Sequence, residues 1–210
     1  MRTFWVLMFV GLLSGCGGGR MPVTQYYKLD IPPAPAPVGP TVPASLRIEP
    51  FETAVLLRQD RIVYRPSPVQ VGFYEYHRWA EPPNDTLTRA LADQLTKRRV
   101  FQSVEISDAE DKVDYVLRGR VERLQEVDYM GGVRVQVSIS AQLDDPVQQK
   151  TVWSNVASSD SVVTKSSVQA VVQAMSQASQ QSISRLMTDV TKAVQLNHHA
   201  SVSSSGSTAH

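Results

Sequence analysis

Strict alternation of apolar and polar residues is the clearest pattern in the chain, and it covers two long segments near the middle. Apolar residues or glycine occupy every second position over residues 113–121, and apolar residues do so again over residues 133–143. A period of two predicts strands with one face in the core and one in water, which is typical of an antiparallel sheet. Gly131-Gly132 predicts a turn between them, and Asp144-Asp145-Pro146 predicts a turn into a third strand over residues 151–157.

Shorter strands are expected before this meander. Residues 46–49 and 61–65 alternate, and residues 69–76 are rich in Val and aromatic side chains. Residues 26–29 also read as a short strand. We therefore expect strands on both sides of any N-terminal linker.

Two segments show helical spacing. A first helix should begin near Pro82-Pro83-Asn84-Asp85, with Asn84 or Asp85 as its N-cap, before a regular series of leucines. A second has apolar residues at helical spacing from Val168 to Val194. We expect this stripe to pack along the sheet, with a partner helix or a lipid surface as the alternative. The predicted fold class is an α/β (α+β) two-layer sandwich, a mostly antiparallel sheet with two helices packed on one face.

The N-terminus has the layout of a signal peptide. Arg2 precedes an apolar run from Phe4 to Leu13, which is too short to span a bilayer, and Ser14-Gly15-Cys16 follows. Residues 13–16 match the lipobox of bacterial lipoproteins, in which the Cys is acylated and the peptide is cut before it. We predict a signal peptide over residues 1–15, lipidation of Cys16 and a lipidated tether over residues 16–25. An ordinary secreted protein is the alternative.

Cys16 is the only cysteine of the chain, so acylation would leave the mature protein without a disulfide. Three acyl chains exceed the two signals that stable anchoring needs. Gly17 follows, where an Asp would resemble the inner-membrane retention signal, so we expect an outer-membrane protein anchored on the periplasmic face. The inner membrane is the less favoured alternative. No cofactor is expected apart from the covalent lipid.

A proline-rich segment over residues 31–43 favours polyproline II structure. It could be a stiff spacer that lifts the domain from the membrane, or a surface loop inside the domain. The short strand over residues 26–29 favours the loop. We therefore assign residues 26–196 to one domain that contains this loop.

The Ser-rich residues 197–210 are predicted to be a disordered tail, in which His198 and His199 are solvated rather than metal ligands. The chain has 21 Lys and Arg against 20 Asp and Glu. This balance gives no electrostatic footprint for nucleic acid, so no nucleic-acid partner is expected. The lipid is the expected membrane attachment.

The sequence contains no recognisable catalytic constellation. His77 is the only His of the predicted domain, and a nucleophile elbow, a phosphate loop and metal-ligand spacing are all missing. Glu81 beside Trp79 could serve a glycosidase only with a second acid in register. We therefore predict that the protein is not an enzyme.

Residues 61–82 concentrate aromatic and charged side chains more than any other stretch. Arg, Tyr and Trp supply much of the binding energy at protein interfaces. We predict a partner-binding surface there, with a strand and a buried Trp79 as the simpler alternative. The candidate residues are Arg61, Tyr64, Arg65, Tyr74, Tyr76, Trp79 and Glu81.

Four motifs together resemble the ABC-type transport auxiliary lipoproteins, the family that includes the paraquat-inducible-operon lipoprotein. They are the Cys16 lipobox, Tyr-Tyr-Lys-Leu at residues 26–29, Arg-Ile-Val-Tyr-Arg at residues 61–65, and Trp-Ala-Glu-Pro at residues 79–82. The resemblance extends from Tyr26 to Val194. Residues 55–58 depart from the turn found in many relatives, so this loop is expected to contact something different here.

The resemblance implies an accessory role in an intermembrane transport system. Relatives are encoded with an ABC ATPase, a permease and a protein carrying mammalian-cell-entry (MCE) domains. Such systems move phospholipids or other hydrophobic molecules between membranes. The expected function is a non-catalytic lipoprotein that docks the MCE assembly at the outer membrane, with the MCE protein, permease and ATPase as partners.

Two other functions remain open at this point. One is a structural outer-membrane lipoprotein that binds a β-barrel or peptidoglycan, because fold does not fix function. The other is a domain that carries lipid in an apolar cavity. The sequence gives neither the transported molecule and its direction nor the oligomeric state.

Overall fold

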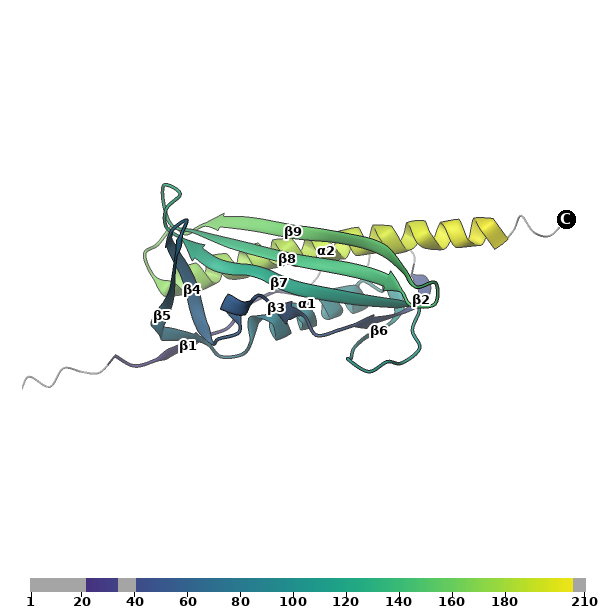
Figure 1. Ribbon diagram of the computed structural model, residues 1–210, viewed down its shortest axis with the longest axis horizontal. Helices are drawn as coiled ribbons and strands as arrows, with labels where there is room; N and C mark the ends of the chain where they lie inside the picture. Colours follow the sequence, from purple (N-terminus) through teal and green to yellow (C-terminus); the bar gives the residue numbers. More distant parts are fainter. Residues whose placement is uncertain (1–21, 34–40, 206–210) are drawn as a thin grey trace, which may run out of the picture.

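The computed structural model describes residues 22–33 and 41–205, which form one mixed sheet and two long helices (Figure 1). The signal peptide, Cys16 and the end of the predicted tail therefore lie outside the described residues. The strands of the nine-stranded sheet are β1 (Gln25–Tyr27), β2 (Val42–Ile48), β3 (Glu52–Thr53), β4 (Arg61–Ser67), β5 (Gln70–Trp79), β6 (Phe101–Ile106), β7 (Tyr115–Val127), β8 (Arg134–Asp145) and β9 (Lys150–Val162). The helices are α1 (Pro83–Lys97), α2 (Val168–Ser205) and a short 3-10 helix, η1 (Val55–Leu57).

Strand β7 organises the sheet. One of its edges pairs antiparallel with β8 along almost its whole length, and β8 pairs antiparallel with β9. The other edge is shared by three shorter strands, β2, β3 and β4, which pair with β7 in parallel and follow one another along it. The predicted meander is thus confirmed, and the parallel pairing of the earlier strands is an addition to it.

A bend between β2 and β3 brings Phe51 over β7. The Phe51 ring is 2 % exposed and lies on Gly119, where an added Cβ would overlap its ring atoms. The backbone on either side of the bend stays bonded to β7, because the N–H of Glu49 donates to the Leu117 carbonyl and that of Ala54 to the Val121 carbonyl. Gly119 is therefore a position of close approach inside the predicted alternation.

Both helices cover the same face of the sheet (Figure 1). Their apolar stripes meet the inward residues of β7, β8 and β9, and the predicted stripe of α2 belongs to this core. Full burial of one such aliphatic side chain contributes about 1.5–3 kcal/mol. The α/β two-layer class is confirmed, and the α2 stripe is core rather than a free surface.

The first helix begins at Pro83, within the predicted region, but its N-cap is neither Asn84 nor Asp85. Pro82 is its N-cap and supplies no side-chain hydrogen bond, and Pro83 stands in its first turn. The Asn84 amide donates instead to the Phe51 carbonyl at 2.9 Å. The Asn84 side chain, which was expected to cap α1, thus holds the β2–β3 bend against this helix.

Three further differences concern the number, length and register of the strands. Strand β6 was not predicted, because its apolar residues Phe101, Val104 and Ile106 do not keep a period of two; Phe101 is the only one that is buried. Strand β9 extends from Lys150 to Val162, beyond the predicted residues 151–157. A register shift between Val121 and Arg123 interrupts the alternation of β7.

The proline-rich segment lies within the domain. β1 pairs in parallel with β5 before it, and β2 belongs to the same sheet after it. Residues 34–40 lie outside the described residues, but both flanking strands show that the segment connects parts of one sheet. This supports the loop interpretation over the spacer.

The prediction of a disordered tail from residue 197 was wrong for residues 197–205, because α2 continues to Ser205. Ala favours a helix, Ser and His disfavour it only slightly, and neither Gly nor Pro occurs between Val168 and Gly206. The helix can therefore extend past its last buried residue.

We expect Gly119→Ala to destabilise the domain by about 1–3 kcal/mol, since the new methyl group must displace the buried Phe51 ring. Urea unfolding followed by circular dichroism measures this loss. The double variant Gly119→Ala/Phe51→Leu should lose less than the sum of the two single variants. An unchanged midpoint for Gly119→Ala would show that Phe51 does not pack there.

Candidate partner-binding surface

The β4–β5 hairpin holds most of the residues predicted to bind a partner, and it stands at one end of the long sheet (Figure 1). Arg61 begins β4, where its guanidinium lies 5.1 Å from the centre of the Phe73 ring and donates to the Gln59 side chain at 2.8 Å. Both contacts leave the side chain partly exposed. Arg61 is therefore held in one place but remains available to a partner.

The predicted residues Tyr64 and Tyr74 are brought together across the hairpin. Their ring centres are 5.1 Å apart, and the Tyr64 ring covers Gly72, where a side chain would overlap it. The absence of a Cβ at Gly72 thus allows two aromatic rings to pack side by side. Neither ring is fully exposed, so they shape the hairpin more than they offer contact area.

The Tyr74 hydroxyl donates to Glu126 of β7 at 2.8 Å. Glu126 is 5 % exposed, and burial, followed by the charge of Asp128, raises its pKa to about 7 although the Tyr74 hydrogen bond lowers it. Burial and the same hydrogen bond raise the pKa of Tyr74. A buried carboxyl group therefore ties the hairpin to the central strand.

His77 continues this network toward the N-terminus. Its ring packs edge-on against Tyr74 at 5.5 Å, and its Nδ1 lies 3.0 Å from the Tyr27 hydroxyl. Tyr27 belongs to β1, the first described strand. The network thus joins β1, β5 and β7 through aromatic and polar contacts.

The tip of the hairpin and its middle hold two more candidates. The Arg65 guanidinium donates to the Pro68 carbonyl, which closes the turn. Tyr76 is 37 % exposed and is the most accessible predicted tyrosine. Tyr76 and Arg61 are accordingly the strongest contact candidates of the hairpin.

Trp79 differs from the others because it is 6 % exposed and belongs to the hydrophobic core. A core Trp cannot serve as an exposed anchor, so for Trp79 the simpler alternative of a buried side chain holds. Glu81 pairs with Arg89 of α1 at 2.5 Å. It lines a hollow of about 440 Å³ together with Arg58 and Asp60.

The loop flagged at residues 55–58 adjoins this hollow. Val55 is 70 % exposed and Leu56 43 % exposed, while Leu57 lines the hollow itself. Protein interfaces combine apolar side chains at their centre with polar and charged ones at the rim, and this region offers both. The loop and Glu81 together extend the candidate surface away from the hairpin.

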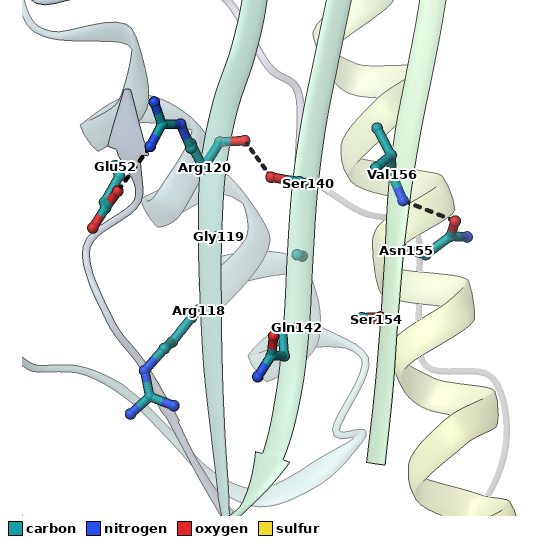
Figure 2. A pocket seen from close by; sticks show the side chains of 10 residues that line it. Glu52, Arg118, Gly119, Arg120, Ser140, Gln142, Ser154, Asn155 and Val156 are labelled. Atoms are coloured by element: carbon teal, nitrogen blue, oxygen red, sulfur yellow. Dashed lines mark hydrogen bonds and ion pairs between the residues drawn. The ribbon is translucent and has the colours of Figure 1, made fainter. Parts of the chain in front are cut away.

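Sequence reasoning gave no role to the uncovered face of the sheet. Figure 2 shows a shallow hollow on β7, β8 and β9, with Arg118 and Arg120 on one side and Val156 on the other. Its volume is about 590 Å³. The polar positions of the predicted alternation were the signal for this face, but alternation alone does not reveal a concave shape.

The charges on this face are paired with each other. Arg118 bonds Glu49 at 3.0 Å and Asp144 at 2.6 Å, and Arg120 lies 3.3 Å from Glu52. Burial lowers the pKa of Arg118, but Glu49 and Asp144 outweigh it and raise the pKa above its ordinary value. Such mutual pairing leaves little free charge for a charged ligand.

Within residues 22–33 and 41–205, no group of three or more His, Cys, Asp and Glu is placed to hold a metal ion. In the same residues no helix combines the length and apolar character needed to cross a membrane. His77 contacts Tyr27 and Tyr74, whereas Glu81 pairs with Arg89. His77 and Glu81, the two side chains that the sequence analysis weighed for catalysis, therefore contact different partners.

The arrangement defines a class of protein, an α/β two-layer domain whose first described strand, β1, lies at the edge of the sheet. A protein of Xanthomonas campestris from the DUF330 family has this fold, with a TM-score of 0.75 and 21 % identity over 83 % of this chain and 99 % of that chain. A hypothetical protein of Chlamydia trachomatis is similar, with a TM-score of 0.53 and 6 % identity over 73 % and 98 %. These likenesses show the fold. No curated protein matches the chain.

The model of the ABC-type transport auxiliary lipoprotein component matches residues 27–186, and the chain belongs to this family. The resemblance inferred from the sequence motifs is thus confirmed. Membership makes the chain an auxiliary lipoprotein of an ABC transport system, with an envelope location. The matched residues include the whole β4–β5 hairpin.

We expect Glu126→Gln to be more stable than the wild type at pH 8 and to remove a pH dependence. The wild-type carboxyl holds its proton in the fold up to about pH 7 but loses it near 4.5 when unfolded. Its stabilising contribution is therefore full below about pH 4.5 and is lost as pH rises through about 7. Urea unfolding at several pH values measures the difference.

The control for this experiment is Glu75→Gln, which removes an exposed carboxylate from the same hairpin. The stability of Glu126→Gln relative to the wild type should increase between pH 5 and 8. The stability of Glu75→Gln relative to the wild type should not increase in this way. A Glu126→Gln variant that parallels the wild type at every pH would show that Glu126 is ionised in the fold.

Proposed function

We propose that this chain is a non-catalytic accessory lipoprotein of an ABC/MCE-type transport system, acylated on Cys16 and held at the outer membrane. It would dock the periplasmic MCE assembly to that membrane while the system moves lipids or other hydrophobic molecules. The observation that carries the proposal is the family match over residues 27–186, which spans the hairpin and the core beneath it.

The position of β1 supports a short link between lipid and domain. β1 pairs with β5 from Gln25↔His77 onward, so the chain is fixed to the sheet nine residues after Cys16. Residues 17–24 reach on the order of 25 Å when fully extended. A domain tethered this closely would stay near the membrane, and a partner would have to come to it.

The accessible residues give the proposed docking surface its chemistry. Arg61 and Tyr76 lie on the hairpin, and the exposed Val55 and Leu56 lie beside the hollow that Glu81 lines. Arg and Tyr are enriched among residues that dominate interface energy, and apolar neighbours exclude water around them. Trp79 and the tyrosine pair would hold this surface in shape from below.

The test is affinity capture from detergent-solubilised envelopes, with a tag placed after His210 and mass spectrometry of the captured proteins. Recovery of an MCE-domain protein with its permease and ATPase is the expected result. Recovery of a β-barrel protein in their place would favour a structural outer-membrane role and contradict the proposal.

We expect Tyr76→Ser and Arg61→Glu to reduce capture of the MCE protein by roughly tenfold or more, which corresponds to about 1.4 kcal/mol of binding energy per tenfold. Val147→Ser is the matched control, because Val147 is 82 % exposed in the β8–β9 turn, away from the hairpin. Urea midpoints should be unchanged in all three variants. Normal capture by both hairpin variants would remove the hairpin from the docking surface.

We expect Cys16→Ser to abolish lipid attachment and to prevent signal-peptide cleavage before residue 16. Metabolic labelling with an alkyne analogue of palmitate followed by gel analysis measures this. The wild type should incorporate the label and the variant should not. Labelling of the Cys16→Ser protein would place the lipid elsewhere, since the chain has no other cysteine.

A further inference from the structure

Exposed apolar side chains gather at one end of the molecule, where the β4–β5 hairpin, the β7–β8 turn and the end of β9 meet. We call these four residues the tip patch: Val69, Tyr129, Met130 and Val162. They are 91 %, 39 %, 53 % and 58 % exposed. Turn tips are usually polar, so apolar residues at several adjacent tips need an explanation.

Backbone hydrogen bonds hold the adjoining turns together. The Asp128 N–H donates to the Arg65 carbonyl at 3.0 Å, which ties the β7–β8 turn to the hairpin. The Val163 N–H donates to the Val133 carbonyl at 2.9 Å, which ties the end of β9 to the start of β8. The tip patch is therefore presented by a fixed framework.

The N-terminal edge strand lies at the same end of the long axis. In Figure 1, β1 and the β4–β5 hairpin stand together there, while α2 extends to the opposite end. Residues 17–21 separate Cys16 from the first described residue, Pro22, and a chain of this length reaches on the order of 17 Å. A lipid on Cys16 would thus keep this end of the domain next to the bilayer.

The charges near the tip patch also suit a membrane surface. Arg65 and Arg134 flank the two turns, and the exposed Lys165 lies in the connection that follows β9, while Asp128 and Asp160 are the exposed acids nearby. Tyr with long basic side chains is typical of the membrane interface, where the apolar part enters and the charge stays in water.

We propose that the tip patch enters the interfacial layer of the membrane that holds the Cys16 lipid. The occupant is a lipid surface, and the inference rests on the proposed lipid anchor. The acyl chains and the tip patch contact the membrane at separate points. These contacts fix the tilt of the domain relative to the membrane as well as its distance from it. The long axis then points away from the membrane, and the C-terminal part of α2 projects into the periplasm.

The test uses the full mature lipoprotein in vesicles of phosphatidylethanolamine and phosphatidylglycerol. Val69→Cys and Met130→Cys each receive a bimane label, and lipids with a nitroxide near the headgroup act as quenchers. Acylation of Cys16 leaves the introduced thiol as the only reactive one. Val147→Cys, exposed in the β8–β9 turn at the far end, is the matched control. Circular dichroism shows whether each variant is folded.

Quenching of the Val69 and Met130 labels well above that of the Val147 label is expected, because interfacial insertion reaches about 5–10 Å into the bilayer. Equal quenching of all three labels on protein that floats with the vesicles would overturn this inference alone. Wild-type protein that does not float with the vesicles would overturn the anchor, and with it both proposals.

Discussion

The pairing along β7 is the constraint on which the rest of the structure depends. Its thirteen residues present one edge to β8 and the other to β2, β3 and β4 in succession. Strands of two to seven residues are too short to be stable alone, so each gains its place from the long strand beside it. The hairpin, the β2–β3 bend and α1 are all positioned through that one edge.

The meander could be predicted because its signal is local. Period-2 alternation and two turn motifs are read within the consecutive residues 113–157, and they need no knowledge of distant partners. The parallel strands could not be placed in the same way. Leu46 pairs with Tyr115 and Val63 with Gln125, and nothing in either short segment specifies a partner so far along the chain.

The exposure of the candidate residues could be predicted only in part, for a related reason. A cluster of Arg and Tyr residues is visible in sequence, and the structure keeps Arg61 and Tyr76 accessible. Burial of Trp79 depends on α1 and the core, which composition cannot reveal. Glu126 was missed because the predicted alternation ends at Val121, and the register shift that follows reverses the phase of β7 so that this carboxylate is buried.

That inward carboxylate shows what the hairpin requires. A buried Glu is unfavourable by itself, since burial opposes its charge, and an aliphatic residue at the same position would be expected to stabilise the sheet. The Tyr74–Glu126 hydrogen bond is directional, however, and apolar contacts are not. With Gly72 admitting the Tyr64 ring on the other side, this bond defines one orientation of β5 relative to β7. A hairpin fixed in this way loses little conformational freedom on binding, so more of its contact energy is available to hold a partner or a membrane surface.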